Sequence, residues 1–209
     1  MIRAVIGDSM QRVIYFVATS IDGCIARHDD TFDFFLNEGE HAKDYWTALK
    51  TFDAVVMGRR TYEVATKLGV TNPYPWLQTF VVSKQIEKSP DPNVTIVSND
   101  VVEAVRSIRE REGRGIYLCG GGRLASLLLE HGLVDEIIIK LNPVIAGGGI
   151  PMFATMEKPT RLELVDSKVY ENGVVVLRYG VIRPRRAVAS PDDAGDEFHD
   201  DRAEVVTER

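Results

Sequence analysis

The sequence predicts an α/β fold in which helices cover both faces of a mainly parallel sheet and an antiparallel hairpin completes one edge. Short apolar runs of strand length alternate along the chain with amphipathic stretches of helical spacing, the pattern of strands joined by crossover helices. The first run, residues 12–19, is almost continuously apolar, as in strands buried on both faces. Asn172-Gly173, the strongest short-range hairpin signal, separates the last two β-rich segments.

Length and charge define the domain organisation. A chain of 209 residues is expected to hold one domain. We predict an N-terminal extension at 1–11, the domain at 12–183 and an acidic, disordered tail at 184–209. Residues 191–209 contain eight acidic and two basic side chains, which accounts for the whole net charge of −6. The neutral body lacks the positive surface of proteins that bind nucleic acid or acidic membranes.

Several other classes of protein are also excluded. Cys24 and Cys119 form no C-x-x-C pair, so free thiols in a reducing compartment are favoured over a disulfide. The four histidines show no metal-ligand spacing, and no metal site is predicted. No apolar run approaches membrane-spanning length, and residues 1–10 lack the apolar core of a signal peptide. We therefore expect a cytoplasmic protein.

The remaining elements follow from periodicity and turn residues. Strands are predicted at 54–57, 79–82, 94–97, 116–119, 135–141, 162–170 and 174–182. Helices are predicted to begin after Asn37, at Gly58, after Asp100 and after the glycines at 120–122. Asn37 and Asp100 each precede a glutamate by three positions, as in a capping box. Asp44 is expected on the solvent side of the first helix.

A triple glycine, Gly120 to Gly122, joins the strand at 116–119 to the following helix. Without Cβ atoms this backbone can turn sharply and let a ligand approach, while the helix start offers unpaired N–H donors and partial positive charge. The expected ligand is an anion, most often a phosphate. The alternative is a tight strand-to-helix turn without a ligand. A Rossmann fingerprint is absent, because the spacing differs from G-x-G-x-x-G and Lys140 stands where an acid is required.

A second strand–glycine–helix junction follows the strand at 54–57 and carries Gly58, Arg59, Arg60 and Thr61. Arginine binds phosphate through paired hydrogen bonds, and threonine adds a donor. The alternative is a solvated helix start. Two such junctions favour a ligand with two separated phosphate groups, bound beyond the carboxyl ends of the strands.

Asp22 follows the first strand in the turn Ser20-Ile21-Asp22-Gly23. Aspartate often forms such turns by bonding its own backbone. It can also serve as a site carboxylate, since loops at strand ends carry function. The sequence leaves both uses open.

In its ordered motifs the chain resembles the dihydrofolate reductase superfamily, most closely the branch containing the reductase domain of riboflavin biosynthesis. The motifs lie at residues 19–26, 57–63, 82–84, 120–124, 132–136 and 143–153. The resemblance implies a dihydrofolate reductase-like, three-layer α/β/α sandwich. It also implies a homodimer that passes hydride from NADPH to a small heterocycle, either pterin-like or aminopyrimidine-like. The implied activity is that of a dihydrofolate reductase or a 5-amino-6-(5-phosphoribosylamino)uracil reductase.

The same resemblance assigns roles to residues. It places at the adenosine end of NADPH the residues Gly58, Arg59, Arg60, Thr61, Ser83 and Lys84. It places at the pyrophosphate Gly120, Gly121, Gly122, Arg123 and Leu124. It places at the nicotinamide Ala18, Ile25 and Ala26. Asp22 is the predicted catalytic residue, which orients substrate or relays a proton.

Two functional hypotheses follow. The first is an NADPH-dependent reductase, favoured by Asp22 and by an aromatic group comprising Phe32, Phe34, Phe35, Tyr45 and Trp46. The second is a non-catalytic NADP(H)-binding protein of the same fold. It is favoured because the first helix offers only Glu38 where dihydrofolate reductases have a carboxylate that meets the pteridine ring.

Overall fold

The computed structural model describes residues 10–183. Its helices are α1 (Glu40–Leu49), α2 (Arg59–Lys67), α3 (Val101–Arg109) and α4 (Gly122–Glu130). Its strands are β1 (Val13–Thr19), β2 (Cys24–Ala26), β3 (Ala54–Gly58), β4 (Gln78–Val82), β5 (Val94–Val97), β6 (Ile116–Gly120), β7 (Glu136–Leu141), β8 (Ile150–Pro151), β9 (Leu162–Val169) and β10 (Val175–Val181).

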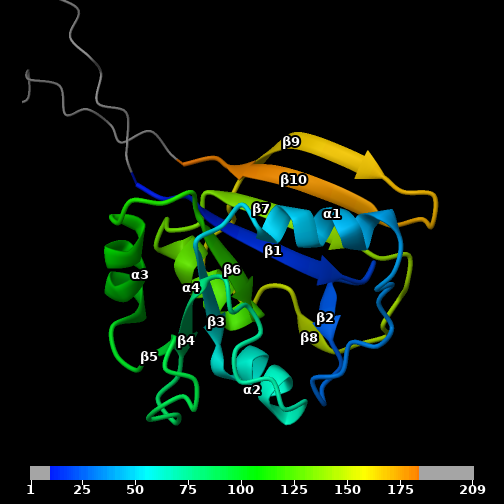
Figure 1. Cartoon of the computed structure of the whole chain (residues 1–209). Helices are drawn as coiled ribbons and strands as arrows, with labels where there is room; N and C mark the ends of the chain where they lie inside the picture. Colours follow the sequence, from blue (N-terminus) through cyan, green and yellow to red (C-terminus); the bar gives the residue numbers. More distant parts are fainter. Residues whose placement is uncertain (1–9, 184–209) are drawn as a thin grey trace, which may run out of the picture.

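The central sheet has the order β5-β4-β3-β6-β1-β7-β10-β9, with β5 and β9 at opposite edges (Figure 1). The strands from β5 to β7 are parallel to their neighbours. Strands β10 and β9 continue the sheet as an antiparallel pair, which turns at Asn172-Gly173 with Gly173 at φ 83°. Strands β2 and β8 form a separate two-stranded sheet. The predicted mainly parallel sheet with a C-terminal hairpin is confirmed.

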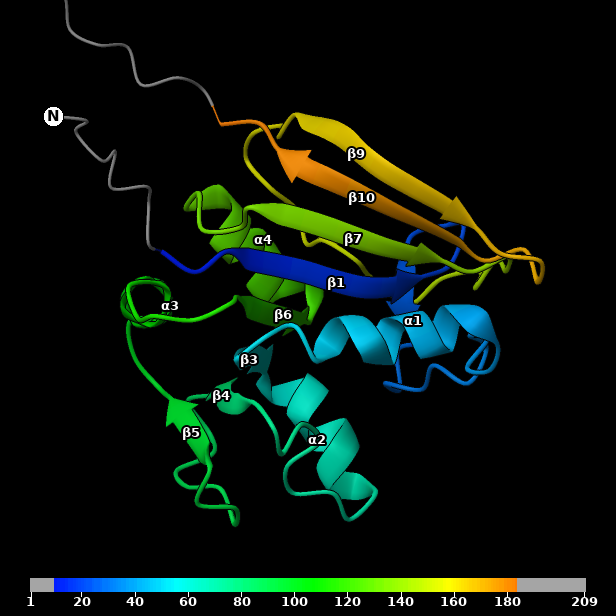
Figure 2. The same ribbon diagram turned by 45° about the horizontal axis from the view of Figure 1, so that its top comes forward.

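The helices lie in two layers on opposite faces of this sheet (Figure 2). Val105 of α3 and Leu128 of α4 pack into one apolar cluster, whereas Leu49 of α1 and Tyr62 of α2 pack into the other. The side chains of β1 alternate between the two clusters, because successive residues of a strand point to opposite faces. This explains why β1 reads as continuously apolar.

Strand register brings the predicted cofactor residues to one edge of the sheet. Gly58 at the end of β3 lies opposite Val82 of β4, and Met57 lies opposite Gly120 of β6. The starts of α2 and α4 therefore emerge side by side. This is the edge where parallel α/β sheets bind ligands.

The start of α1 differs from the prediction. Its N-cap is Gly39, not Asn37, and no side chain caps it. The backbone before the helix is held elsewhere: the Leu36 N–H donates to Asn142 Oδ1 at 3.1 Å, and His41 Nε2 lies 2.9 Å from the Leu36 carbonyl oxygen. These contacts with the end of β7 and with α1 itself keep residues before Gly39 out of the helix.

Asp44 makes contacts that the sequence did not predict. It is half-buried and accepts hydrogen bonds from Lys168 Nζ at 2.7 Å and from the Tyr170 hydroxyl at 2.8 Å. The β9–β10 hairpin supplies both donors, since it lies next to α1. Because 46% of its side chain is exposed, Asp44 meets solvent as predicted, and only its contacts with the hairpin were not predicted.

The predicted terminal segments lie mostly outside the described residues. Residues 1–9 of the extension and the tail at 184–209 are not described. Gln11 is buried, and its side-chain amide donates to the carbonyl oxygens of Ile108 and Arg111. Within residues 10–183, no helix combines the length and apolarity that crossing a bilayer requires.

Candidate active site

The two strand–glycine–helix junctions and β2 meet around Gly121. A Cβ atom added to Gly58 would lie 3.6 Å from the Gly120 carbonyl oxygen, so the junctions are in contact. A Cβ atom added to Gly121 would lie 3.8 Å from both Ile25 Cδ1 and Thr61 Oγ1. Three segments that the sequence separates thus converge on one point.

The starts of α2 and α4 are electrostatically distinct from those of the other described helices. Helix α1 carries Glu40 in its first turn, and α3 carries Glu103 and is capped by the side chain of Asp100, as predicted. Helices α2 and α4 have neither a side-chain cap nor an acid in the first turn. Their first N–H groups and the positive end of the helix dipole remain available to an anion.

The three consecutive glycines have different structural requirements. Gly120 has φ 108°, a conformation that favours glycine, and the Gly120–Gly121 peptide bond is cis. A Cβ atom on Gly122 would lie 2.4 Å from the Pro151 carbonyl oxygen, so packing against β8 requires glycine there. Gly121 has φ −78° and meets no such obstacle. Neither backbone conformation nor packing therefore requires a glycine at this position.

Both arginines of the α2 junction contact acidic side chains. Arg59 Nη1 lies 2.7 and 2.8 Å from the two carboxylate oxygens of Glu63, one helical turn further on. Arg60 lies 2.6 Å from Asp30 Oδ1 and donates to the His28 carbonyl oxygen at 3.2 Å. These contacts hold Arg59 along α2 and tie Arg60 to the loop after β2.

Ser83 and Lys84, the pair predicted at the end of β4, differ in their exposure. The Ser83 hydroxyl oxygen is buried and accepts hydrogen bonds from the N–H groups of Gln85 and Ile86 at 3.1 and 2.9 Å. The hydroxyl proton is left to donate elsewhere. Lys84 is exposed. The β3–β4 register places both residues beside the start of α2.

Asp22 contacts the loop that follows β7. Its Oδ1 accepts from the Ser20 hydroxyl at 2.6 Å and from the Ala146 N–H at 2.9 Å, and its Oδ2 accepts from the Gly147 N–H at 2.9 Å. The Ser20 bond, followed by the two backbone bonds, lowers the pKa of this carboxyl to about 2. An ionised loop anchor accounts for this geometry, and a catalytic role for Asp22 stays a prediction.

The anchor predicts a pH-dependent stability difference between wild type and Asp22→Asn. The folded-state pKa of about 2 lies below the ordinary value of 3.8, so the stabilisation is present above pH 3.8 and is lost as the pH falls through the folded-state pKa. The wild type should melt at a higher temperature than the variant at neutral pH. The two midpoints should converge between about pH 4 and about pH 2. A gap independent of pH would contradict the anchor.

The family is decided by comparison with known proteins. A sequence profile described as the RibD C-terminal domain matches residues 11–176, which is most of the chain. The chain belongs to the RibD C-terminal domain family.

Individual relatives agree with this assignment. The chain is 29% identical over 165 residues to the uncharacterized protein YwjB of Bacillus subtilis, covering 78% of this chain and 95% of that one. A structure from Shewanella sp. PV-4, provisionally named a riboflavin biosynthesis protein, matches with a TM-score of 0.73 and 25% identity, over 83% of this chain and all of that one. Dihydrofolate reductase of Enterococcus faecalis, complexed with NADP(H), matches with a TM-score of 0.57 and 17% identity, over 81% and 96%. This last likeness concerns the fold.

This member of the RibD C-terminal domain family also has a hydroxyl and thiol cluster that the sequence did not predict. The hydroxyl groups of Tyr45 and Tyr117 lie 3.0 Å apart, and the Tyr74 hydroxyl lies 3.7 Å from Cys119 Sγ. Burial raises the pKa of Tyr45 to about 12 and also raises the pKa of the Cys119 thiol. These groups are therefore neutral at physiological pH, next to the glycine loop.

A lysine is the second group that the sequence analysis missed. Lys140 is buried at the end of β7, where its Nζ donates to the Leu36 carbonyl oxygen at 3.0 Å. The available signal was a single lysine in the otherwise apolar run Ile137-Ile138-Ile139-Lys140-Leu141. A charged residue inside a buried strand requires a physical reason.

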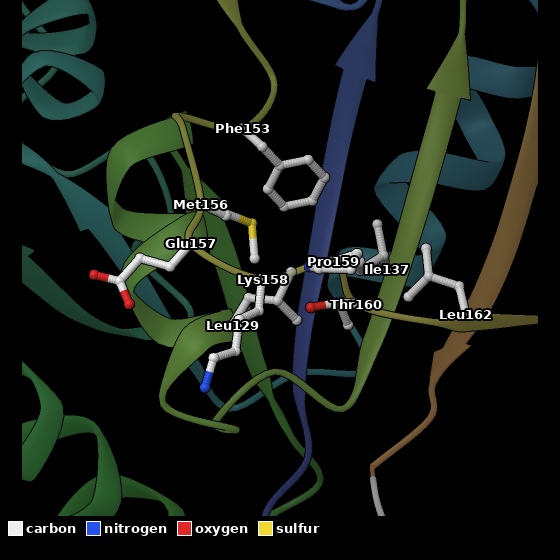
Figure 3. A pocket seen from close by; sticks show the side chains of 9 residues that line it. All are labelled: Leu129, Ile137, Phe153, Met156, Glu157, Lys158, Pro159, Thr160 and Leu162. Atoms are coloured by element: carbon white, nitrogen blue, oxygen red, sulfur yellow. The ribbon is translucent and has the colours of Figure 1, made fainter.

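Two hollows border different parts of the structure. One of about 350 Å³ lies between the loops after β2 and β7, lined by Arg27, His28, Asp29, Ala146, Gly147 and Gly148. The other, of about 330 Å³, is bordered by Phe153, Met156, Ile137 and neighbours on the α4 side of the sheet (Figure 3). The predicted cofactor residues line neither hollow. Within residues 10–183, no group of three or more His, Cys, Asp or Glu side chains is placed to hold a metal ion.

Proposed function

We propose that the protein is an NADPH-dependent reductase that transfers hydride to a small heterocyclic substrate, pterin-like or aminopyrimidine-like. One observation carries the proposal: two helix starts with neighbouring arginines converge on Gly121, and neither helix has a side-chain cap or an acidic residue in its own first turn. This arrangement suits a ligand with two separated phosphate groups. The fold shared with a dihydrofolate reductase complexed with NADP(H) supports the choice of cofactor.

The residues of the site have distinct roles in this proposal. NADPH, when bound, supplies the hydride. The first N–H groups of α4, with Arg123 beside them, hold the pyrophosphate. Arg59, Arg60 and Thr61, together with Ser83 and Lys84, hold the adenosine end. Ala18, Ile25 and Ala26 provide apolar surface for the nicotinamide, and Asp22 keeps the loop at 143–149 in position. The protein thus contributes orientation, which lowers the entropic part of the barrier.

A substrate panel separates this proposal from the non-catalytic alternative. Oxidation of NADPH is measured against pterins, aminopyrimidines and quinonoid compounds, and the reductase hypothesis expects turnover with at least one group. NADPH binding without turnover would favour the alternative. One observation keeps that alternative in view: Glu38 is exposed and precedes α1, and Glu40 of α1 binds Lys168 at 2.8 Å.

Cofactor preference tests the role of Arg59. NADPH carries a ribose phosphate that NADH lacks, and each hydrogen bond to a charged group is worth about 1.5–3 kcal/mol. Arg59→Ala should therefore weaken NADPH binding by roughly tenfold to a hundredfold. NADH should be affected much less. Calorimetric titration of both cofactors measures this.

The Arg59–Glu63 contact supplies a matched control. Glu63→Gln keeps the arginine but removes the carboxylate that competes with a phosphate for it, so NADPH binding should be maintained or tightened. Equal affinities of the wild type for NADH and NADPH would refute the assignment. So would an Arg59→Ala loss of equal size for both cofactors.

We further propose a cytoplasmic homodimer formed through β9. All eight residues of this edge strand are exposed, with Val165 58% and Val169 73% accessible. Four of its eight residues are apolar, and within residues 10–183 its outer edge is unpaired, so it can pair with another strand. Val165→Lys should shift the protein from dimer to monomer in sedimentation experiments. A monomeric wild type would contradict the proposal.

A further inference from the structure

Lys140 is a buried cation with little internal compensation. Only 8% of the surface of this residue is exposed to solvent. Its Nζ donates to the Leu36 carbonyl oxygen at 3.0 Å, and within residues 10–183 no carboxylate lies within ion-pair distance of it. The Leu36 carbonyl already has a second polar neighbour, His41 Nε2 at 2.9 Å.

The cost of this burial is not offset by the residues that the structure describes. An ammonium group has three donors, and the Leu36 carbonyl uses one of them. Removing a charge from water without an acidic partner is unfavourable, and burial accordingly lowers the pKa of Lys140. The other side chains that contact the Leu36 backbone are His41, at its carbonyl oxygen, and Asn142, at its N–H group. Neither is an acid. Among the described residues 10–183, Lys140 therefore has no partner rich in acceptor oxygens.

The position of Lys140 relates it to the proposed nicotinamide surface. In the β1–β7 register, Lys140 lies directly opposite Ala18, and directly opposed residues of a parallel pair point to the same face. That face is the one covered by α1, because Ile138, two residues earlier on β7, packs into the α1–α2 cluster. Lys140 is thus a neighbour of a residue assigned to the cofactor.

Solvent reaches the sheet at this point. Ala18 is partly exposed, although the residues on either side of it, Val17 and Thr19, are buried at 8% and 2% accessibility. Tyr45 of α1 packs edge-to-face on Phe16, one step earlier on the same face, with the ring centres 5.0 Å apart. Helix α1 therefore covers Phe16 and leaves Ala18 open. A flat ring stacked beside a nicotinamide at Ala18 would come within reach of the adjacent lysine.

We propose that Lys140 determines substrate specificity by donating a hydrogen bond to an oxo or carboxylate oxygen of the heterocyclic substrate. The inference rests on the proposed reductase function and specifies its substrate. A lysine has donors only, so it selects rings that present acceptors and rejects rings that present amino or amidinium groups at the same position. A site built around a carboxylate would have the opposite selectivity.

The test compares two ligands in which the carbonyl oxygens of one are replaced by amino groups in the other. Diaminouracil carries two ring carbonyls, and in tetraaminopyrimidine amino groups replace both. Each is titrated by calorimetry into the wild type, Lys140→Met and Lys140→Arg, all saturated with NADP⁺. The wild type should bind diaminouracil at least about tenfold more tightly, the effect of one hydrogen bond to a charged group. Lys140→Met should lose this preference, and Lys140→Arg, which keeps the donors, should retain most of it.

Several results would overturn the inference. These are equal wild-type affinities for the two ligands, an unchanged diaminouracil affinity in Lys140→Met, or no binding of either ligand to the NADP⁺-saturated wild type. The wild-type preference requires no variant, so misfolding of Lys140→Met leaves the test intact. NADPH affinity, titrated separately, should be the same in all three proteins. If the wild type did not bind NADPH, the proposed function would be contradicted. If it bound NADPH normally but did not discriminate between diaminouracil and tetraaminopyrimidine, only the role of Lys140 would be contradicted.

Discussion

Gly121→Val should abolish NADPH binding and leave the fold intact. Gly121 has φ −78° and ψ −169°, an extended conformation that valine adopts readily. Its added Cβ would lie at ordinary contact distance, 3.8 Å, from Ile25 and Thr61. The two valine methyl groups would then fill the space between these side chains, where the pyrophosphate must approach the N–H groups of α4. Loss of two charge-assisted hydrogen bonds alone weakens binding by about a hundredfold or more.

A graded variant separates ligand exclusion from damage to the protein. Gly121→Ala adds one carbon at contact distance and should weaken NADPH less than valine does. Both variants should melt within a few degrees of the wild type and keep its circular dichroism spectrum. Normal NADPH affinity in a folded Gly121→Val protein would rule out this loop as the phosphate site.

Gly122→Ala should have the largest effect on stability. The added Cβ would lie 2.4 Å from the Pro151 carbonyl oxygen and 3.0 Å from that of Met152, both of which are backbone atoms. Overpacking of this kind costs about 3 kcal/mol. For a domain of this size, that cost lowers the melting temperature by roughly 6–12 °C. Helix propensity alone predicts the opposite sign, because alanine is more favourable than glycine within a helix by about 1 kcal/mol.

The adjacent position serves as the control for this prediction. Gly121→Ala introduces the same atom one residue earlier, where the nearest atoms are 3.8 Å away, so its melting temperature should remain close to that of the wild type. A Gly122→Ala variant as stable as Gly121→Ala would show that β8 and the residues after it move aside without cost. The contrast therefore tests whether the second and third glycines have separate roles.

The parts of the fold that were predicted depend on local sequence. Short apolar runs identified the strands of the sheet, and Asn172-Gly173 identified the hairpin that the structure contains. Asp100 caps α3 through the Glu103 N–H at 3.2 Å, as its spacing indicated. In each case the signal and the structure it specifies lie within a few residues of one another. The convergence of the glycine junctions followed from a general rule for parallel sheets.

The parts that were missed depend on contacts between distant segments. Asn37 does not begin α1, because Asn142 holds the backbone before it, and Asp44 faces the distant hairpin through Lys168 and Tyr170. Asp22 binds residues more than 120 positions away, and Lys140 binds a carbonyl 104 positions away. Neither propensity nor spacing contains this information. The Arg59–Glu63 contact, in contrast, could have been predicted from the sequence, since residues four apart on a helix are neighbours.

The most direct test of the central claim is an NMR titration of the ¹⁵N-labelled protein with NADPH. If the two helix starts hold the phosphate groups, the largest shifts should fall on the backbone N–H groups of Arg59, Arg60 and Thr61 and on those of Gly121, Gly122 and Arg123. NADH should reproduce the changes at the second group and reduce those at the first. Shifts centred on the apolar hollow beside α4, or no shifts at millimolar NADPH, would contradict the account.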